Sequence, residues 1–248
     1  MEITWKYIFA VSAIFAASVI RGYSGFGFAM ISAITLSFVF PPTQVTPVIL
    51  CLEIAASFWL LYKVRKLVDW KGLKILGAGA FITLPLGSMA LALAPVHLLR
   101  IFISMTIIIL CAGLLFKKQR PKTTGTLSTL VVGMLSGFLT VVASIGGPPV
   151  ILFYFSSNRS VSVSRASMIA FFLVVDILAL ISAVWYGLLN RQTLLLSAGM
   201  LVPLGLGIWT GNAFYGKFAS EEAFRKQVLI FLAGLASISF LKTVLWPS

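Results

Sequence analysis

Long apolar runs alternate with short polar breaks along the chain, a pattern typical of helices that cross a lipid bilayer. The apolar runs, with approximate bounds, cover 5–20, 26–40, 46–62, 75–94, 98–116, 127–144, 148–156, 165–186, 193–215 and 227–245. A spanning helix needs about 20 residues, and the runs 5–20, 26–40 and 148–156 are short for that task. Each half of the chain therefore opens with a pair of runs separated by a glycine-rich break.

Composition places the chain among integral membrane proteins. Hydrophobic residues make up 60% of the 248 residues and charged residues only 10%, which is too few charges for the polar faces of soluble helices. The formal net charge of +13 would suit nucleic acid, but Lys and Arg lie in short loops between the apolar runs. Such loops indicate membrane topology, so we expect no nucleic-acid partner. The predicted fold is all-α, a polytopic membrane protein of about 8–10 membrane segments.

The two halves of the chain resemble each other, which predicts an internal duplication. Similar residues recur about 120 positions apart. The matches are Gly25-Phe26-Gly27 with Gly146-Gly147-Pro148, Glu53 with Asp176, Tyr62 with Tyr186, Pro85-Leu86-Gly87 with Pro203-Leu204-Gly205, and Ala112-Gly113-Leu114 with Ala233-Gly234-Leu235. We therefore expect two membrane repeats, residues 1–122 and residues 123–248, with hairpin tips near 21–27 and 144–149.

The distribution of Lys and Arg favours a hairpin at the start of each half that enters and leaves the membrane on one side. Each half then crosses the membrane three times, and most Lys and Arg fall in loops on the same side, as the positive-inside rule requires. Two full spans in place of each hairpin fit the charges equally well, so the sequence leaves open whether the hairpins are re-entrant. Either choice gives an odd number of crossings per half, and hence inverted repeats with both termini outside.

The two glycine-rich breaks are candidates for a binding site. They read Arg21-Gly22-Tyr23-Ser24-Gly25-Phe26-Gly27 and Ser144-Ile145-Gly146-Gly147-Pro148-Pro149. Non-helical backbone at membrane depth is tolerated only inside protein or beside a wet cavity, and proline suits the first turn of a new helix. We expect short helices to begin near residues 26 and 148, with free N–H groups that favour an anion. The alternative is a pair of kinks that only let helices pack closely.

Both breaks contribute candidate substrate-binding residues. These are Arg21, Gly22, Tyr23, Ser24, Gly25, Gly27, Ser144, Gly146, Gly147 and Pro148. Arg21 is the most specific, because a guanidinium in a membrane is costly unless it is paired or wet, and its fork fits an oxyanion. Alternatively, Arg21 snorkels to an interface or pairs with Glu53 or Asp176 as a structural contact. The hydroxyl groups either bind a ligand or only connect helices.

Glu53 and Asp176 are acidic residues near the middle of long apolar runs, at equivalent positions of the two repeats. Ionised carboxylates are costly there, so we expect a cation partner, a protonated state or a role in proton-coupled transport. The alternative is a neutral carboxyl group that hydrogen-bonds the backbone of a broken helix. Cys51, Cys111 and the sole histidine, His97, are scattered, so the sequence predicts no disulfide, metal site or other cofactor.

With these features the chain resembles the sulfite exporter TauE/SafE family of membrane permeases, also called the TSUP family. The resemblance rests on the break from Gly22 to Gly27, its counterpart Gly146-Gly147-Pro148-Pro149 and the duplicated helical body, and it covers residues 5–245. Tyr23 and Phe26 stand where glycine is more usual in the family. The resemblance implies a bacterial-type inner membrane and an anionic solute such as sulfite, a sulfonate (sulfoacetate, for example) or a related carboxylate.

We therefore expect a secondary transporter of a small organic or sulfur-containing anion in a lipid bilayer, with proton coupling as a further hypothesis. A passive anion channel is the alternative, and it would show flux without saturation or counterflow. A membrane-embedded enzyme is expected less, because no Cys or His cluster and no nucleophile–base arrangement is visible in the sequence. A homodimer is compatible with the sequence, which fixes neither the oligomeric state nor the direction of transport.

Overall fold

Helices form all the regular structure in the part of the chain that the computed structural model describes, residues 2–24, 27–116, 125–155, 157, 159–214, 233–234, 236–241 and 243–245. The elements are α1 (Glu2–Ser24), α2 (Phe28–Ser37), α3 (Pro42–Val64), η1 (Arg65–Leu67), α4 (Trp70–Leu93), α5 (Val96–Phe116), α6 (Thr126–Ala143), α7 (Gly147–Phe155), α8 (Val161–Trp185) and α9 (Arg191–Phe214). Part of the expected run 227–245 lies outside the described residues, and its described residues from 236 onward are helical.

Seven of the described helices are long and apolar enough to cross a membrane: α1, α3, α4, α5, α6, α8 and α9. The helices α2 and α7 have only 10 and 9 residues. At 1.5 Å per residue they reach roughly half of a hydrocarbon core about 30 Å thick. The prediction of an all-α polytopic membrane protein is confirmed.

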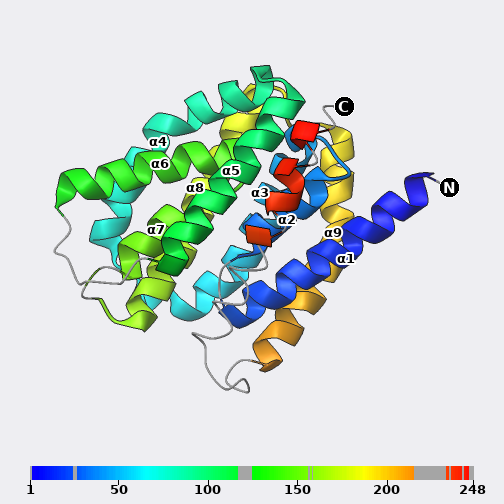
Figure 1. Cartoon of the computed structure of the whole chain (residues 1–248). Helices are drawn as coiled ribbons and strands as arrows, with labels where there is room; N and C mark the ends of the chain where they lie inside the picture. The colour runs from blue at the N-terminus through cyan, green and yellow to red at the C-terminus, as the bar shows by residue number, and fades with distance from the viewer. Residues whose placement is uncertain are drawn as a thin grey trace.

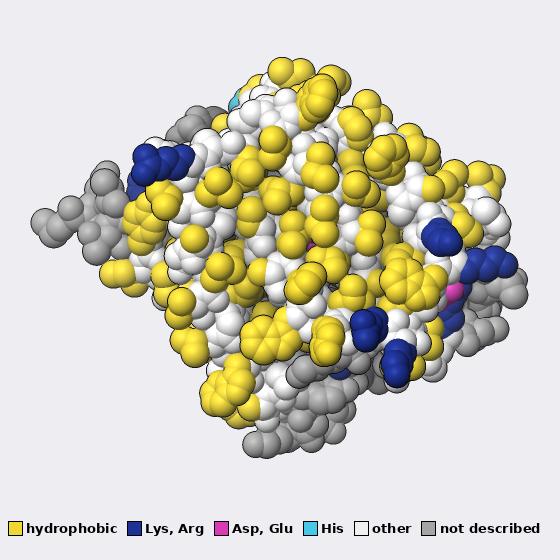
Figure 2. Space-filling view, turned by 180° about the vertical axis from the view of Figure 1, so that it is seen from behind, with side chains coloured by type: hydrophobic (Ala, Val, Ile, Leu, Met, Phe, Trp, Pro, Cys, Tyr) yellow, Lys and Arg dark blue, Asp and Glu magenta, His cyan; other side chains and the backbone are white. Residues whose placement is uncertain are grey.

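Apolar side chains cover much of the outside of the helix bundle. Figure 2 shows a face on which hydrophobic side chains dominate, while Lys and Arg gather toward its edges. Large side chains such as Phe58, Trp59 and Trp185 are exposed, the last by 88%. An apolar surface of this extent would associate in water, and it suits contact with lipid.

Two helix pairs pack so closely that only glycine fits between their backbones. In Figure 1, α1 lies beside α9 and α4 lies beside α6. A Cβ atom at Gly211 of α9 would overlap the carbonyl oxygen of Val19 in α1, and one at Gly133 of α6 would overlap that of Leu76 in α4. Small residues give membrane helices this close approach, on which their association depends because lipid supplies no hydrophobic driving force.

The contacts between the two halves of the chain are arranged symmetrically. When α1, α3 and α4 are matched with α6, α8 and α9, the pair α4–α6 corresponds to α9–α1, and α3 contacts α8 at the centre. Pro85 lies within α4 and Pro203 within α9. Two related halves would produce this pattern, because a contact between two helices then has an equivalent contact between the helices matched with them. The repeat boundary at residue 122 lies outside the described residues, and it stays a prediction together with the inverted orientation.

The first opening pair differs from the sequence prediction. The run 5–20 is predicted from the sequence to be short for a full span, but α1 extends to Ser24, and Trp5–Tyr23 is long enough to be a candidate span. The break is accordingly shorter than residues 21–27. Arg21 continues the helix because its charge is paired within the protein.

The predicted positions of the two short helices are confirmed. The first helix, expected near residue 26, begins at Phe28, and the second, expected near 148, begins at Gly147. Each opening pair is therefore one long helix followed by one short helix. How each pair enters and leaves the membrane stays a prediction.

Candidate functional site

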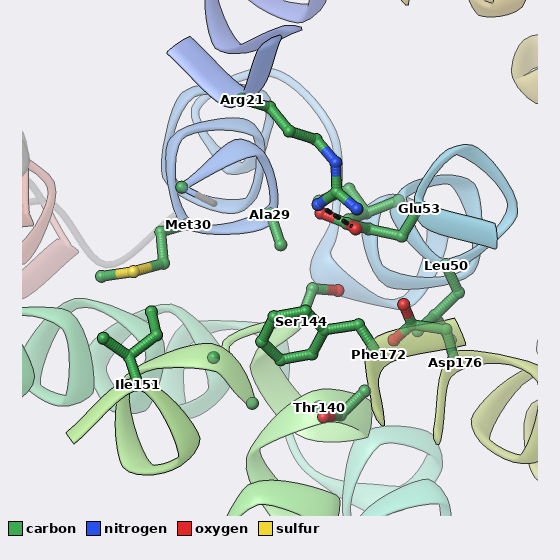
Figure 3. Close-up of a pocket in the computed structure, with 14 residues that line it drawn as sticks. Arg21, Ala29, Met30, Leu50, Glu53, Thr140, Ser144, Ile151, Phe172 and Asp176 are labelled. Carbon is green, nitrogen blue, oxygen red and sulfur yellow. Dashed lines mark ion pairs between the residues drawn. The ribbon is translucent and has the colours of Figure 1, made fainter. Parts of the chain in front are cut away.

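A small cavity lies where the two short helices begin (Figure 3). Its volume is about 40 Å³, and its lining comes from α1, α2, α3, α6, α7, α8 and the breaks. A single water molecule needs roughly 10–15 Å³ of such space, so the cavity has room for about three waters or one small oxyanion. The lining residues are Arg21, Gly27, Ala29, Met30, Ile49, Leu50, Glu53, Thr140, Ser144, Gly146, Gly147, Ile151, Phe172 and Asp176.

The N-terminal end of α2 faces the cavity. Gly27 precedes the helix in a left-handed conformation, with φ of 94°, which glycine adopts without strain, and no side chain of the described residues caps the helix. The first amide groups of an α-helix have no acceptor within the helix, and they carry the positive end of its dipole. Gly27, Ala29 and Met30 all line the cavity, so this positive end lies at the site.

The second break places the start of α7 at the same cavity. Ser144 ends α6 in a left-handed conformation, with φ of 55°. The Ser136 hydroxyl donates to the carbonyl oxygen of Gly146 at 2.5 Å, and a Cβ atom at Gly146 would overlap Oγ1 of Thr140. This close approach holds Gly146 and Gly147 against the cavity, where a larger residue at position 146 would push them away.

Arg21 is buried, with 2% of its surface exposed, and both ends of its guanidinium contact α3. Nη1 forms an ion pair with Oε2 of Glu53, and Nη2 donates to Oγ of Ser57 at 2.7 Å. Nε has no hydrogen-bond partner among the described residues. The backbone N–H of Ala29 also interacts with the Glu53 carboxylate. The sequence prediction allowed Arg21 either a substrate or a carboxylate as its partner, and in this structure the partner is Glu53.

Asp176 is the second carboxyl group at the cavity. It lies on α8, which packs against α3, and it is 5% exposed. The charges that act on it are Glu53 and Arg21, yet no hydrogen bond or ion pair reaches it from the part of the chain that the structure describes. Figure 3 shows Glu53 and Asp176 on the same side of the site. An unpaired buried carboxylate is costly, which favours the neutral form of Asp176 in this state.

Ser144 supplies a neutral hydrogen-bonding group. Its side chain is 4% exposed and lines the cavity. Its Oγ has no hydrogen-bond partner among the described residues, although buried hydroxyl groups are normally satisfied. The cavity therefore combines two helix N-terminal ends with one arginine, which is paired with Glu53, and one hydroxyl without a described partner. In the first turn of α7, Pro148 and Pro149 have no N–H to donate, so α2 is the stronger donor end for an oxyanion.

The cavity brings together several of the residues predicted from the two breaks, with both predicted carboxyl groups. The residues concerned are Arg21, Gly27, Ser144, Gly146, Gly147, Glu53 and Asp176. Gly22 and Tyr23 are not among the lining residues. Gly22 packs against the backbone of Ile208 in α9, and the backbone of Tyr23 lies against Gly211. Both residues therefore take part in the packing of α1 against α9, and a part in substrate binding stays a prediction.

The remaining predicted residues either do not line the cavity or lie outside the described residues. Pro148 is in the first turn of α7, as expected from its ring, and does not line the cavity. Gly25 lies outside the described residues, as does the side chain of Ser24.

Ser57, Thr140 and Phe172 belong to the site and were not predicted. Each lies four residues from a predicted residue on the same helix or its C-cap: Ser57 from Glu53, Thr140 from Ser144, and Phe172 from Asp176. Residues four apart share a helix face. This spacing is the signal that could have identified them.

Comparison with known proteins gives one match. The model of the family described as Sulfite exporter TauE/SafE matches residues 10–239. This range includes every residue that lines the cavity. Searches of curated proteins and of solved structures found no match.

Proposed function

Because the chain belongs to the TauE/SafE sulfite exporter family, we propose that it carries a small oxyanion across the membrane through this cavity. Family membership and the seven apolar helices make it a multi-pass membrane protein of an anion-exporter type. The observation that carries the proposal is the meeting of two helix N-terminal ends with Arg21 and the free Ser144 hydroxyl around one cavity. We place the protein in a bacterial-type inner membrane, as the family resemblance implies.

Cavity size narrows the class of substrate. A volume of about 40 Å³ suits an anion of about four heavy atoms, because a water molecule alone needs roughly 10–15 Å³. Sulfite has that size, whereas sulfoacetate would require the cavity to widen. Sulfite is therefore the first substrate to test, with larger sulfonates and carboxylates after it.

Transport by alternating access would use two inverted repeats, residues 1–122 and 123–248. The exchange of partners between α4–α6 and α9–α1 supports the duplication. The positions of α2 and α7 fit secondary transporters in which discontinuous helices meet at the binding site. In this proposal, one bundle rocks against the other about the two breaks.

Sulfite flux in liposomes tests the proposal, with Ser144→Ala as the diagnostic variant. Ser104→Ala is its matched control, because Ser104 is also buried with an unpartnered hydroxyl but does not line the cavity. We expect Ser144→Ala to reduce flux at least tenfold, since one good hydrogen bond to a charged group contributes about 1.5–3 kcal/mol. Equal fluxes in the two variants would show that the anion does not pass through the cavity.

Counterflow separates a carrier from a passive channel. A carrier loaded with unlabelled sulfite should accelerate uptake of labelled sulfite, and its flux should saturate. A pH gradient should drive accumulation if protons are coupled to the anion. Flux that rises linearly with concentration, without counterflow, would identify the protein as a passive anion channel instead of a transporter.

A further inference from the structure

Arg21 has no free Nη atom for a substrate in this structure. Its Nη1 is paired with Glu53, and its Nη2 donates to Ser57 at 2.7 Å. Both partners lie on α3, one turn apart, and all three residues are buried. A bidentate hold on an oxyanion needs two parallel N–H groups. At the edge of the guanidinium formed by its two Nη atoms, an anion could take that hold only after the Glu53 contact is broken.

Glu53 itself occupies the place of an anion. Its carboxylate interacts with the guanidinium of Arg21 and with the backbone N–H of Ala29 at the start of α2. These are two of the positive groups that make the cavity attractive to an oxyanion. Like an oxyanion, the Glu53 carboxylate presents charged oxygens to these donors, so a side chain of the protein itself already engages them.

Building on the proposed function, we propose that Glu53 is an internal competitor of the transported anion. The anion binds Arg21 when Glu53 releases it, and Glu53 does so by taking up one proton. Charge favours this exchange, because a monovalent anion beside Arg21 and a neutral Glu53 leaves the cavity neutral. The same anion added beside an ionised Glu53 would leave a buried net charge of −1, which is costly.

The charged and titratable groups that face Glu53 limit which side chain could take up the proton. Arg21 faces it from α1 and Asp176 from α8, and α2 contributes a backbone N–H. The residues of α6 and α7 that line the cavity carry no titratable side chain. The neutral form of Asp176 is already favoured in this state, so Glu53, the carboxyl group that holds Arg21, is the one that can take up the proton.

Methanesulfonate is the probe for the test, because it stays singly charged between pH 5 and pH 8 whereas sulfite titrates there. Isothermal titration calorimetry on the purified protein should show affinity rising up to about tenfold per pH unit as the pH falls, the limit for one coupled proton. Glu53→Gln should bind at least tenfold tighter than the wild type at pH 8 and lose the pH dependence. Asp176→Asn, a matched change in the same cavity, should keep a pH-dependent affinity.

The proton can also be counted in the wild type, which does not depend on a variant that folds. Binding heats in buffers of different ionisation enthalpy should show one proton taken up per anion at pH 8. No proton uptake, or a pH dependence lost in Asp176→Asn and kept in Glu53→Gln, would overturn the role of Glu53. If wild-type binding requires Ser144 while Glu53→Gln changes nothing, only this inference fails. If the wild type binds no small oxyanion at any pH, the proposed function fails with it.

Discussion

Arg159 and Asp69 form an ion pair in which Nη2 of the arginine lies 2.6 Å from Oδ2 of the aspartate. Asp69 also caps α4 by accepting the N–H of Gly72 at 3.2 Å, and the Arg159 guanidinium lies over the rings of Phe153 and Tyr154. These contacts tie the segment between α7 and α8 to the loop before α4. Because α7 begins at the cavity, the pair fixes the far end of a helix that lines the site.

Breaking this pair should destabilise the protein modestly. The two side chains are 30% and 18% exposed, so water screens part of their attraction. We expect Asp69→Asn and Arg159→Gln each to cost about 1 kcal/mol and the double variant to cost less than their sum. Thermal unfolding in detergent measures this coupling, with Lys71→Gln, an exposed charge in the first turn of α4, as the control. Fully additive losses would show that the pair contributes nothing.

Close packing of α1 against α9 predicts a difference between two glycines of one helix. A Cβ atom at Gly211 would overlap the backbone of α1, whereas one at Gly199 meets no described atom within 4 Å. Gly211→Ala should therefore lower stability by about 1–3 kcal/mol. Gly199→Ala should be neutral or gain up to about 1 kcal/mol, because alanine favours the helix. Similar melting temperatures for the two variants would contradict this packing.

Arg21 shows most clearly how much of the candidate site could be predicted from the sequence. Charges inside apolar runs are rare, so Arg21, Glu53 and Asp176 could be selected from the sequence alone. Which carboxyl group pairs with Arg21 depends on how α1, α3 and α8 are rotated about their axes. Hydropathy does not encode that rotation, and the choice of Glu53 came from the structure.

Element limits and apolar lining residues were harder to predict. Hydropathy falls at Arg21, which suggested a break there, yet the helix continues to Ser24 because the charge is neutralised by a residue remote in sequence. Phe172 is one of 20 phenylalanines in the chain, and only its spacing of four residues from Asp176 distinguishes it in the sequence. Its position four residues before Asp176 became informative only when Asp176 was placed at the cavity.

The Arg21–Glu53 pair predicts a rescue by double substitution. Arg21→Gln leaves Glu53 buried without its cation, and removing one partner of a buried pair typically costs about 3–5 kcal/mol. Arg21→Gln with Glu53→Gln leaves two neutral amides of similar volume and should recover most of that loss. Melting temperatures of the single and double variants test this. A double variant that is no more stable than Arg21→Gln would show that the pair is not the reason for the loss.

Ser144 allows its structural and functional roles to be separated. It adopts a left-handed conformation, with φ of 55°, which costs a non-glycine residue roughly 1–2 kcal/mol. Ser144→Gly should therefore be more stable than Ser144→Ala by about 1 kcal/mol. Both variants lack the hydroxyl, so both should lose sulfite flux to the same extent. Flux that follows the melting temperature instead would assign Ser144 a purely structural role.

We expect Phe172 to set the size limit of the cavity, which it lines. Its ring lies 3.6 Å from the position that a Cβ atom at Gly147 would take, and Figure 3 shows it among the residues at the centre of the site. Phe172→Ala should widen the cavity and raise the flux of sulfoacetate relative to sulfite at least tenfold. Phe171→Ala is the control, because Phe171 is a buried phenylalanine next to Phe172 that does not line the cavity. Truncating either ring costs about 3–5 kcal/mol, so a change of selectivity shared by both variants would reflect loosened packing and would contradict the size limit.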